Sequence, residues 1–296
     1  MRRFKLIFTL EAVRPWLLLA PALAVILLLF VGGLAATLLQ SLGYLPLIGE
    51  RALSLRAYAD ILSSRSFGAS LALTLYIALV STAISALLAL AVSLALRATR
   101  AGRRALTFIF QLNLPIPHIV GAVAIAQLLA QSGLLARLAA ALGLIDDPAQ
   151  FPPLVSDRWA IGIIVANVWK EAPFIGVTLL AVLENVGEEY EQVAQTLGAG
   201  RWQRFRNVLL PLLLPALLSS SVIVFAFVFG AFELPFFLGV SFPQTLPVLA
   251  YRSYADVDLN ARPQAMAMSV VIALICAALV WVYLWASRRW LRNDER

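Results

Sequence analysis

The chain has 296 residues, of which 61% are hydrophobic and only 13% are charged, whereas about 25% of the residues in an average soluble domain are charged. This composition excludes a disordered chain, and an ordinary soluble fold could not bury so much apolar surface. The formal net charge of +7 is compatible with nucleic-acid binding or with a membrane protein that has basic cytoplasmic loops, so the positions of the charges decide.

Six apolar stretches are each long enough to cross a bilayer as a helix, which takes about 20 residues. The first is longer than the roughly 7–15 apolar residues of a cleaved signal peptide, so we interpret it as a membrane anchor. The sequence therefore predicts an all-α integral membrane protein. The expected spans are residues 16–39, 67–96, 106–130, 159–183, 208–232 and 264–287.

The basic residues indicate how these spans are oriented. An even number of spans places both termini on the same side of the membrane. Fifteen of the 23 basic residues fall in the segments assigned to that side, which are the N-terminus, 97–104, 201–206 and 288–296, and the opposite loops hold seven. Because basic residues concentrate in cytoplasmic loops, we predict that both termini are cytoplasmic and that the charge does not indicate nucleic-acid binding.

Three outer loops connect the spans on the opposite side. Segments 41–66 and 131–158 are each long enough for a short helix along the membrane surface. The third loop, 233–263, is either an interfacial aromatic belt or a segment that gates a path or docks a partner on the outer face. Its aromatic residues are Phe236, Phe237, Phe242, Tyr251 and Tyr254.

The inner loop, residues 184–215, lies between the fourth and fifth spans and has the most informative pattern. Its acidic residues predict a short helix over 188–197, and Gly198 suits the left-handed residue that ends a helix. A second short helix is expected from Arg201, with a turn into the fifth span at 209–211. The first helix has a narrow apolar face suited to a groove on a partner, formed by Tyr190, Val193, Ala194 and Leu197.

The inner loop resembles the signature of the permease subunits of type I ABC importers, written EAA, three residues, G, nine residues, I, one residue, LP. QVA at 192–194 stands for EAA, Gly198 keeps its spacing, and Val208 precedes the LP at 210–211. Two positions depart from the signature. Gln192 replaces the usual glutamate, with Glu191 directly before it, and Val193 replaces the first alanine.

The resemblance covers about residues 67–287. Within it, 167–174 and 238–254 look like the branch that handles polyamines, thiamine, ferric iron or aminoalkylphosphonates. It implies three domains, with 1–66 holding the N-terminus, first span and outer loop, 67–287 forming the permease domain, and 288–296 forming a cytoplasmic tail. The substrate itself is not identified by the sequence.

In that family the loop docks into a cleft of a separate ATPase, whose ATP-driven closure moves the membrane helices. The resemblance thus implies an importer in a bacterial-type inner membrane, with an ATP-binding cassette ATPase dimer that holds ATP and Mg. The resemblance also implies a second permease, which is a different or an identical chain, and an extracytoplasmic substrate-binding protein. It implies no nucleic-acid partner. The docking contacts carried over are Glu191, Gln192, Ala194, Leu197, Gly198 and Arg201.

The sequence contains no pattern typical of a catalytic site. Lys5 and Lys170, the two lysines, both follow an aromatic residue, so neither completes the Gly-Lys of a phosphate-binding loop. The one histidine, His118, and the one cysteine, Cys276, have no companions for a metal site or a disulfide. We predict a noncatalytic chain without its own cofactor, in which His118 is a hydrogen-bonded packing residue rather than a ligand or proton carrier.

Polar residues inside the spans are few. A charge near the bilayer centre costs at least about 2.5–3.5 kcal/mol on insertion scales, so it requires a partner or a water-filled path. Asn167, Lys170 and Glu171 share one helix face, and Pro173 leaves the carbonyl of Trp169 without its helical donor. This face either lines the translocation path or forms a structural ion pair or interhelical hydrogen bond. Glu233 is a further path candidate, and Asn113 and Gln111 are candidates with a weaker signal.

Two other functions remain as alternatives to the importer permease. A gradient-driven secondary carrier or channel should show paired halves and an intramembrane acid network, and neither is visible. A membrane scaffold would use the inner loop as an adaptor site without transport. We therefore favour a permease subunit that forms half of a pathway for a small solute.

Overall fold

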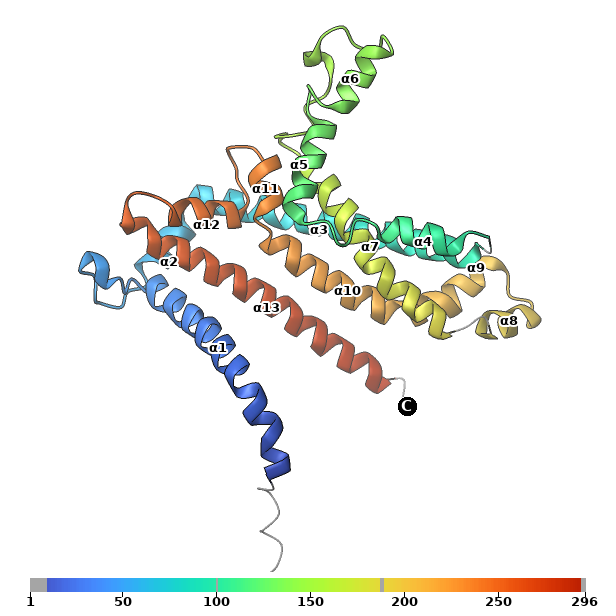
Figure 1. Cartoon of the computed structure of the whole chain (residues 1–296), viewed down its shortest axis with the longest axis horizontal. Coiled ribbons are helices and arrows are strands. Elements are labelled where there is room, and N and C mark those ends of the chain that lie inside the picture. Colours follow the sequence, from blue (N-terminus) through green and yellow to red (C-terminus); the bar gives the residue numbers. More distant parts are fainter. Residues whose placement is uncertain (1–9, 100, 187–188, 294–296) are drawn as a thin grey trace, which may run out of the picture. The chain divides into compact units, whose positions relative to one another are not determined.

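The computed structural model describes residues 10–99, 101–186 and 189–293, and describes side chains from residue 15 to residue 285 within these ranges (Figure 1). In this part of the chain there are α-helices joined by short 3-10 and irregular segments, and no β-strand. The predicted all-α fold with six possible membrane spans is confirmed. The helical stretches long and apolar enough to cross a membrane are Pro15–Ser41, Arg65–Ala98, His118–Ala141, Ile161–Val186, Arg201–Gly230 and Leu259–Trp285.

The chain divides into two compact units. One unit comprises the chain through Ser63 together with Ala250–Val271. In it, the Ser41 hydroxyl at the end of α1 (Leu10–Ser41) lies 2.8 Å from the Tyr58 hydroxyl of α2 (Arg56–Ser63). α2 confirms the short helix expected in the first outer loop. The domain boundaries expected at residues 66 and 287 stay predictions.

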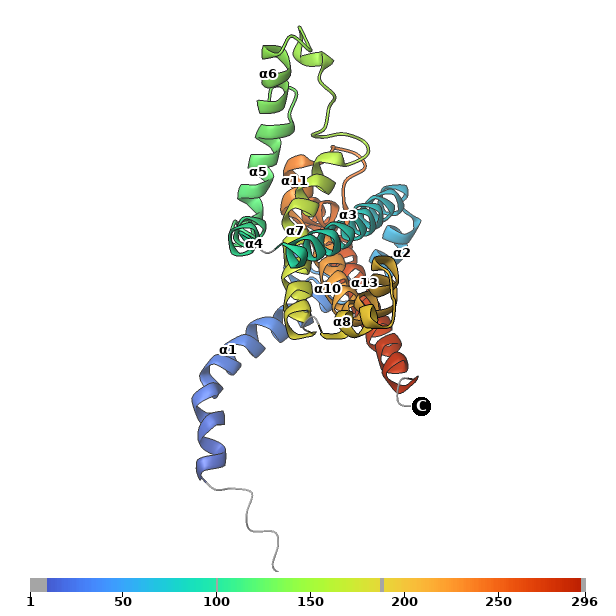
Figure 2. The ribbon, with the colours of Figure 1, turned by 90° about the vertical axis from the view of Figure 1, so that its right-hand side faces the viewer.

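The other unit is built around three long helices that pack on one another (Figures 1 and 2): α3 (Arg65–Ala98), α7 (Ile161–Val186) and α10 (Leu210–Gly230). Small side chains let α3 approach its neighbours closely, as is common between helices in membranes. The Ser93 hydroxyl of α3, for example, donates to the Gly176 carbonyl of α7 at 3.3 Å. The fully buried serines of α3 are Ser70, Ser81, Ser85 and Ser93.

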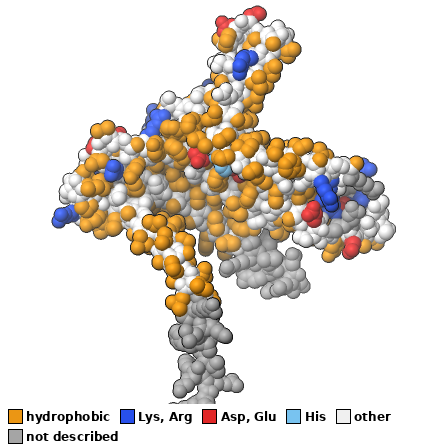
Figure 3. All heavy atoms as spheres, viewed as in Figure 1, with side chains coloured by type: hydrophobic (Ala, Val, Ile, Leu, Met, Phe, Trp, Pro, Cys, Tyr) orange, Lys and Arg blue, Asp and Glu red, His pale blue; other side chains and the backbone are white. Residues whose placement is uncertain are grey.

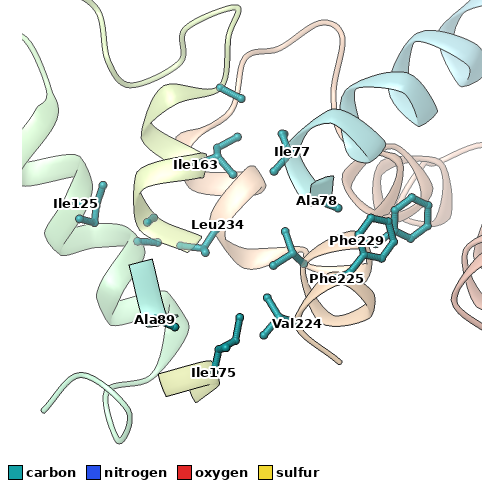
Figure 4. Close-up of a cluster of buried hydrophobic side chains, with 14 of the residues drawn as sticks. Ile77, Ala78, Ala89, Ile125, Ile163, Ile175, Val224, Phe225, Phe229 and Leu234 are labelled. Carbon is teal, nitrogen blue, oxygen red and sulfur yellow. The ribbon is translucent and has the colours of Figure 1, made fainter. Parts of the chain in front are cut away.

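A cluster of buried apolar side chains fills the centre of this unit (Figure 4). It draws on α3, α7 and α10 and on the shorter helices α5 (His118–Leu129) and α11 (Glu233–Leu238). Phe225 and Phe229 of α10 stack with their ring centroids 5.8 Å apart. Hydrophobic side chains also cover most of the face visible in Figure 3, as expected for helices that face lipid. Close packing therefore holds these helices together, since lipid is as apolar as the core.

The third predicted span, 106–130, is wrong as a single helix. α4 (Arg103–Gln111) ends before an irregular segment at 112–117, and α5 begins at His118. Pro115 and Pro117 explain this break, because proline has no N–H to donate and disfavours helical geometry in the residue before it.

The stretch that could cross the membrane is shifted toward the C-terminus, to His118–Ala141. It contains α5 and α6 (Leu134–Ala141), which are separated by the non-helical residues 130–133. Because α6 lies inside this stretch, the short surface helix expected within 131–158 stays a prediction.

The inner loop forms the helices that its sequence predicts but continues differently. α8 (Glu189–Thr196) confirms the first helix, whereas Glu188 lies outside the described residues. α9 (Arg201–Arg204) begins at the expected residue. The expected turn at 209–211 is wrong, because α9 continues through a π-helical segment, Phe205–Leu209, directly into α10. The wider π turn accommodates Pro211, which cannot donate a backbone hydrogen bond.

Candidate functional site

The first polar region is a buried junction between α7 and the break that follows α4. The Lys170 ammonium donates to the carbonyls of Asn113 at 2.7 Å and Leu114 at 3.1 Å, and also to the carbonyl of Ile116. Lys170 is only 6% exposed. Its three N–H donors are therefore satisfied by carbonyls of the irregular segment that follows α4.

The junction also uses the acceptor that Pro173 leaves open in α7. The Asn113 side-chain amide donates to the carbonyl of Trp169, which is the free acceptor that the sequence predicts. Lys170 thus donates from α7 to the break, and Asn113 donates from the break back to the Trp169 carbonyl of α7. Such reciprocal bonds fix where α4 ends relative to α7.

Glu171 and His118 complete the polar junction, which we define as Asn113, His118, Lys170 and Glu171. His118 Nε2 lies 3.3 Å from Glu171 Oε1, and the His118 ring packs on Phe227 with centroids 4.8 Å apart. These contacts confirm that His118 is a hydrogen-bonded packing residue. Among the described residues there is no cluster of His, Cys, Asp and Glu that could hold a metal ion.

The other path candidates lie apart from these hydrogen bonds. Asn167 is fully buried and donates to the carbonyl of Ile163 in its own helix at 3.0 Å. Glu233 is the exposed first residue of α11, and Gln111 is the last residue of α4. A groove of about 340 Å³ between α3, α4 and α7 borders the junction, and Asn113 is its polar lining residue.

The second polar region is the exposed part of the inner loop, α8 and α9. Tyr190, Val193 and Leu197 are 59%, 60% and 82% exposed, so the predicted apolar face points outward. Among the expected docking residues, Gln192, Gly198 and Arg201 are exposed, and Ala194 and Glu191 are half-buried.

The turn between α8 and α9 has a defined geometry. Gly198 has a φ of +86°, the left-handed conformation that its position predicts. The Gln203 side chain accepts from the Gly200 N–H at 2.8 Å, and Arg204 donates to the Gln195 side chain at 3.3 Å. The two short helices are therefore held together by polar contacts across the turn.

Glu191 is engaged within the chain. Its Oε1 lies 2.7 Å from Arg97 Nη2, and Arg97 Nη1 donates to the carbonyl of Leu183 at 3.3 Å. The Arg97 and Glu191 side chains are 12% and 23% exposed. Arg103 and Glu184 form a more exposed pair nearby, 3.3 Å apart. Sequence reasoning missed the role of Arg97, whose only signal was its position as a basic residue at the end of a span.

Comparison with known proteins gives a consistent result. The family model described as "Binding-protein-dependent transport system inner membrane component" matches residues 87–292, which include both polar regions. The sulfate transport system permease protein CysT of Salmonella typhimurium is 30% identical over 227 residues, or 76% of this chain and 78% of that protein. The trehalose/maltose permease MalF of Thermococcus litoralis is 26% identical over 285 residues, or 94% and 95% of the two chains.

The same fold occurs in a solved structure. It is the crystal structure of a bacterial alginate ABC transporter in complex with an alginate pentasaccharide-bound periplasmic protein. One of its chains matches with a TM-score of 0.77 and 21% identity over 93% of this chain and 95% of that chain. The present chain therefore belongs to the binding-protein-dependent transport system inner membrane components and is a permease subunit of an ABC importer.

Proposed function

We propose that this permease forms half of the translocation pathway for a small solute and is driven by ATPase subunits that dock on α8. The outward apolar face of Tyr190, Val193 and Leu197 carries this proposal. A helix that presents anchors at spacings of three and four is suited to a groove on a partner protein. ATP and Mg belong to the partner in this scheme, since the chain has no Gly-Lys phosphate-binding sequence.

The assembly that we propose contains more than one permease. One chain presents one inner loop, and a pair of ATPases requires two, so a second permease, different or identical, completes the membrane part. An extracytoplasmic binding protein delivers the solute, which is supported by the periplasmic protein in the alginate transporter complex. Both termini and the inner loop face the cytoplasm, as the distribution of basic residues indicates.

The polar junction suggests separate roles for the path candidates. The three carbonyls on Lys170 support a structural role for this residue rather than a substrate contact. Two other residues of the junction are better placed to border a path. Glu171 contacts His118, whose side chain is 27% exposed, and Asn113 lines the groove. Asn167 and Glu233 remain path candidates by their position in α7 and α11.

The family and the resemblance point to different candidate substrates. The matched relatives are named for sulfate and for trehalose/maltose, whereas the sequence resembles the polyamine, thiamine, iron and phosphonate branch. We expect the external binding protein to make the selection. Thermal shift of that protein against these ligands identifies the substrate class directly.

Replacement of residues 189–200 with a Gly/Ser linker of equal length tests the docking proposal. The variant should still reach the membrane and elute as a folded protein, but an affinity tag on it should no longer recover the ATPase. The matched control replaces the predicted outer segment 143–150 in the same way and should retain the ATPase. Recovery of the ATPase with the first variant would contradict docking at α8.

A further inference from the structure

We propose that Arg97 is a positioning residue that fastens α8 to the ends of α3 and α7, so that α8 and these two membrane helices move as one piece. We call the contact of Arg97 with Glu191 and the Leu183 carbonyl the brace. This inference rests on the proposed function of α8 and adds the route by which a force on α8 reaches the membrane helices.

The chemistry of the brace suits this task. Arg97 lies in the last turn of α3, Leu183 lies in the last turn of α7, and Glu191 lies in the first turn of α8. A guanidinium is a rigid planar fork, so its two terminal nitrogens hold the carboxylate at 2.7 Å and the carbonyl at 3.3 Å in one fixed geometry.

The brace differs from the neighbouring surface pair. The side chains of Arg97 and Glu191 are 12% and 23% exposed, whereas those of Arg103 and Glu184 are 35% and 68% exposed. Exposed pairs are screened by water and contribute little, and partly buried ones are screened less. Arg103 therefore provides a matched control for Arg97.

Helical geometry separates the brace from the docking face. Glu191 and Gln195 are four residues apart and share one face of α8, where Arg97 and Arg204 hold them. Tyr190, Val193 and Leu197, at spacings of three and four, lie on a different face. The chain thus holds α8 from one side and leaves the other side to the partner.

The test measures the mobility of α8 in the full-length permease without any ATPase. Cys276→Ser removes the single cysteine, and Gln192→Cys places a nitroxide spin label at an exposed position of α8. We expect Arg97→Glu and Glu191→Arg each to narrow the EPR lines of this label, and the double charge swap to restore the parental spectrum. Arg103→Glu should leave the spectrum unchanged. Two results would contradict the brace. One is unchanged spectra in the single variants, and the other is a double variant whose label is as mobile as in the single variants.

A conservative variant and an ATPase measurement complete the test. Arg97→Lys keeps the charge but offers one donor centre for two acceptors, so it should give an intermediate spectrum. In the assembled importer, Arg97→Glu should still recover the ATPase through the intact docking face. Stimulation of ATP hydrolysis by the binding protein should fall about tenfold, the equivalent of one charge-assisted hydrogen bond.

Unaffected stimulation in Arg97→Glu would overturn the coupling role of the brace. The spin-label measurement involves no ATPase, so it can contradict the brace without contradicting the proposal that the ATPase docks on α8. Loss of docking, in turn, is detected by the linker replacement of residues 189–200.

Discussion

The two polar regions of this permease use their side chains in opposite ways. In the polar junction, Lys170, Glu171 and Asn113 all have partners inside the protein. In the inner loop, Arg97 holds Glu191, and the apolar face of α8 points outward. The surroundings explain the difference, since a polar group in lipid must be satisfied internally, whereas an apolar group in water gains from a partner. The buried charge of Lys170 links α7 to the segment after α4, and the exposed apolar face of α8 is our proposed contact with a partner.

The largest expected effect on stability comes from removing the hydrogen bonds that Lys170 makes in the polar junction. Lys170→Met removes the ammonium donor from the carbonyls of Asn113, Leu114 and Ile116. The Asn113 carbonyl keeps the Ile116 N–H as a donor at 3.1 Å, whereas the other two lose the ammonium. We expect the free energy of unfolding to fall by about 3 kcal/mol or more, measured by thermal or denaturant unfolding in detergent. The control, Arg104→Met at an exposed position, should change it little. A Lys170→Met variant as stable as the control would show that the ammonium is not what holds the break.

A smaller effect tests whether Asn113 replaces the hydrogen bond that Pro173 removes. Asn113→Ala should lower the free energy of unfolding by about 1–2 kcal/mol, because the Trp169 carbonyl loses its donor. Pro173→Ala restores an N–H for that carbonyl, so the loss should be smaller in this background. The double-mutant cycle should give a coupling energy of about 1 kcal/mol. Additive effects would mean that the two residues act independently.

How far the sequence predicts these regions depends on the kind of signal. The length of the apolar runs predicted the spans, and Gly198 predicted the end of α8. Both predictions need only residues that are close together in the sequence. Length alone also predicted a continuous third span, although Pro115 and Pro117 were visible and break it. The partners of Lys170 are backbone carbonyls, which no side-chain pattern reveals. Arg97 and Glu191 meet only after three helices have packed, so their pairing had no local signal.

The smallest effect concerns the turn of the inner loop. Gly198 has a φ of +86°, where a side chain is strained, whereas Gly200 has a φ of −69°. Gly198→Ala should therefore cost about 1 kcal/mol of local stability, and Gly200→Ala almost nothing. Hydrogen exchange of the α8 amides should become faster in the first variant only. Equal protection in both variants would show that the turn does not depend on the left-handed residue.

The central claim is that the outward apolar face of α8 binds the ATPase, and two matched leucines test it most directly. Leu197 on the inner loop is 82% exposed, and Leu47 in the predicted first outer loop is 80% exposed. Leu197→Glu should reduce the ATPase recovered with tagged permease by at least about tenfold, because a buried unpaired charge would face the partner's groove. Leu47→Glu should leave the recovery unchanged. Equal recovery with both variants would contradict the account.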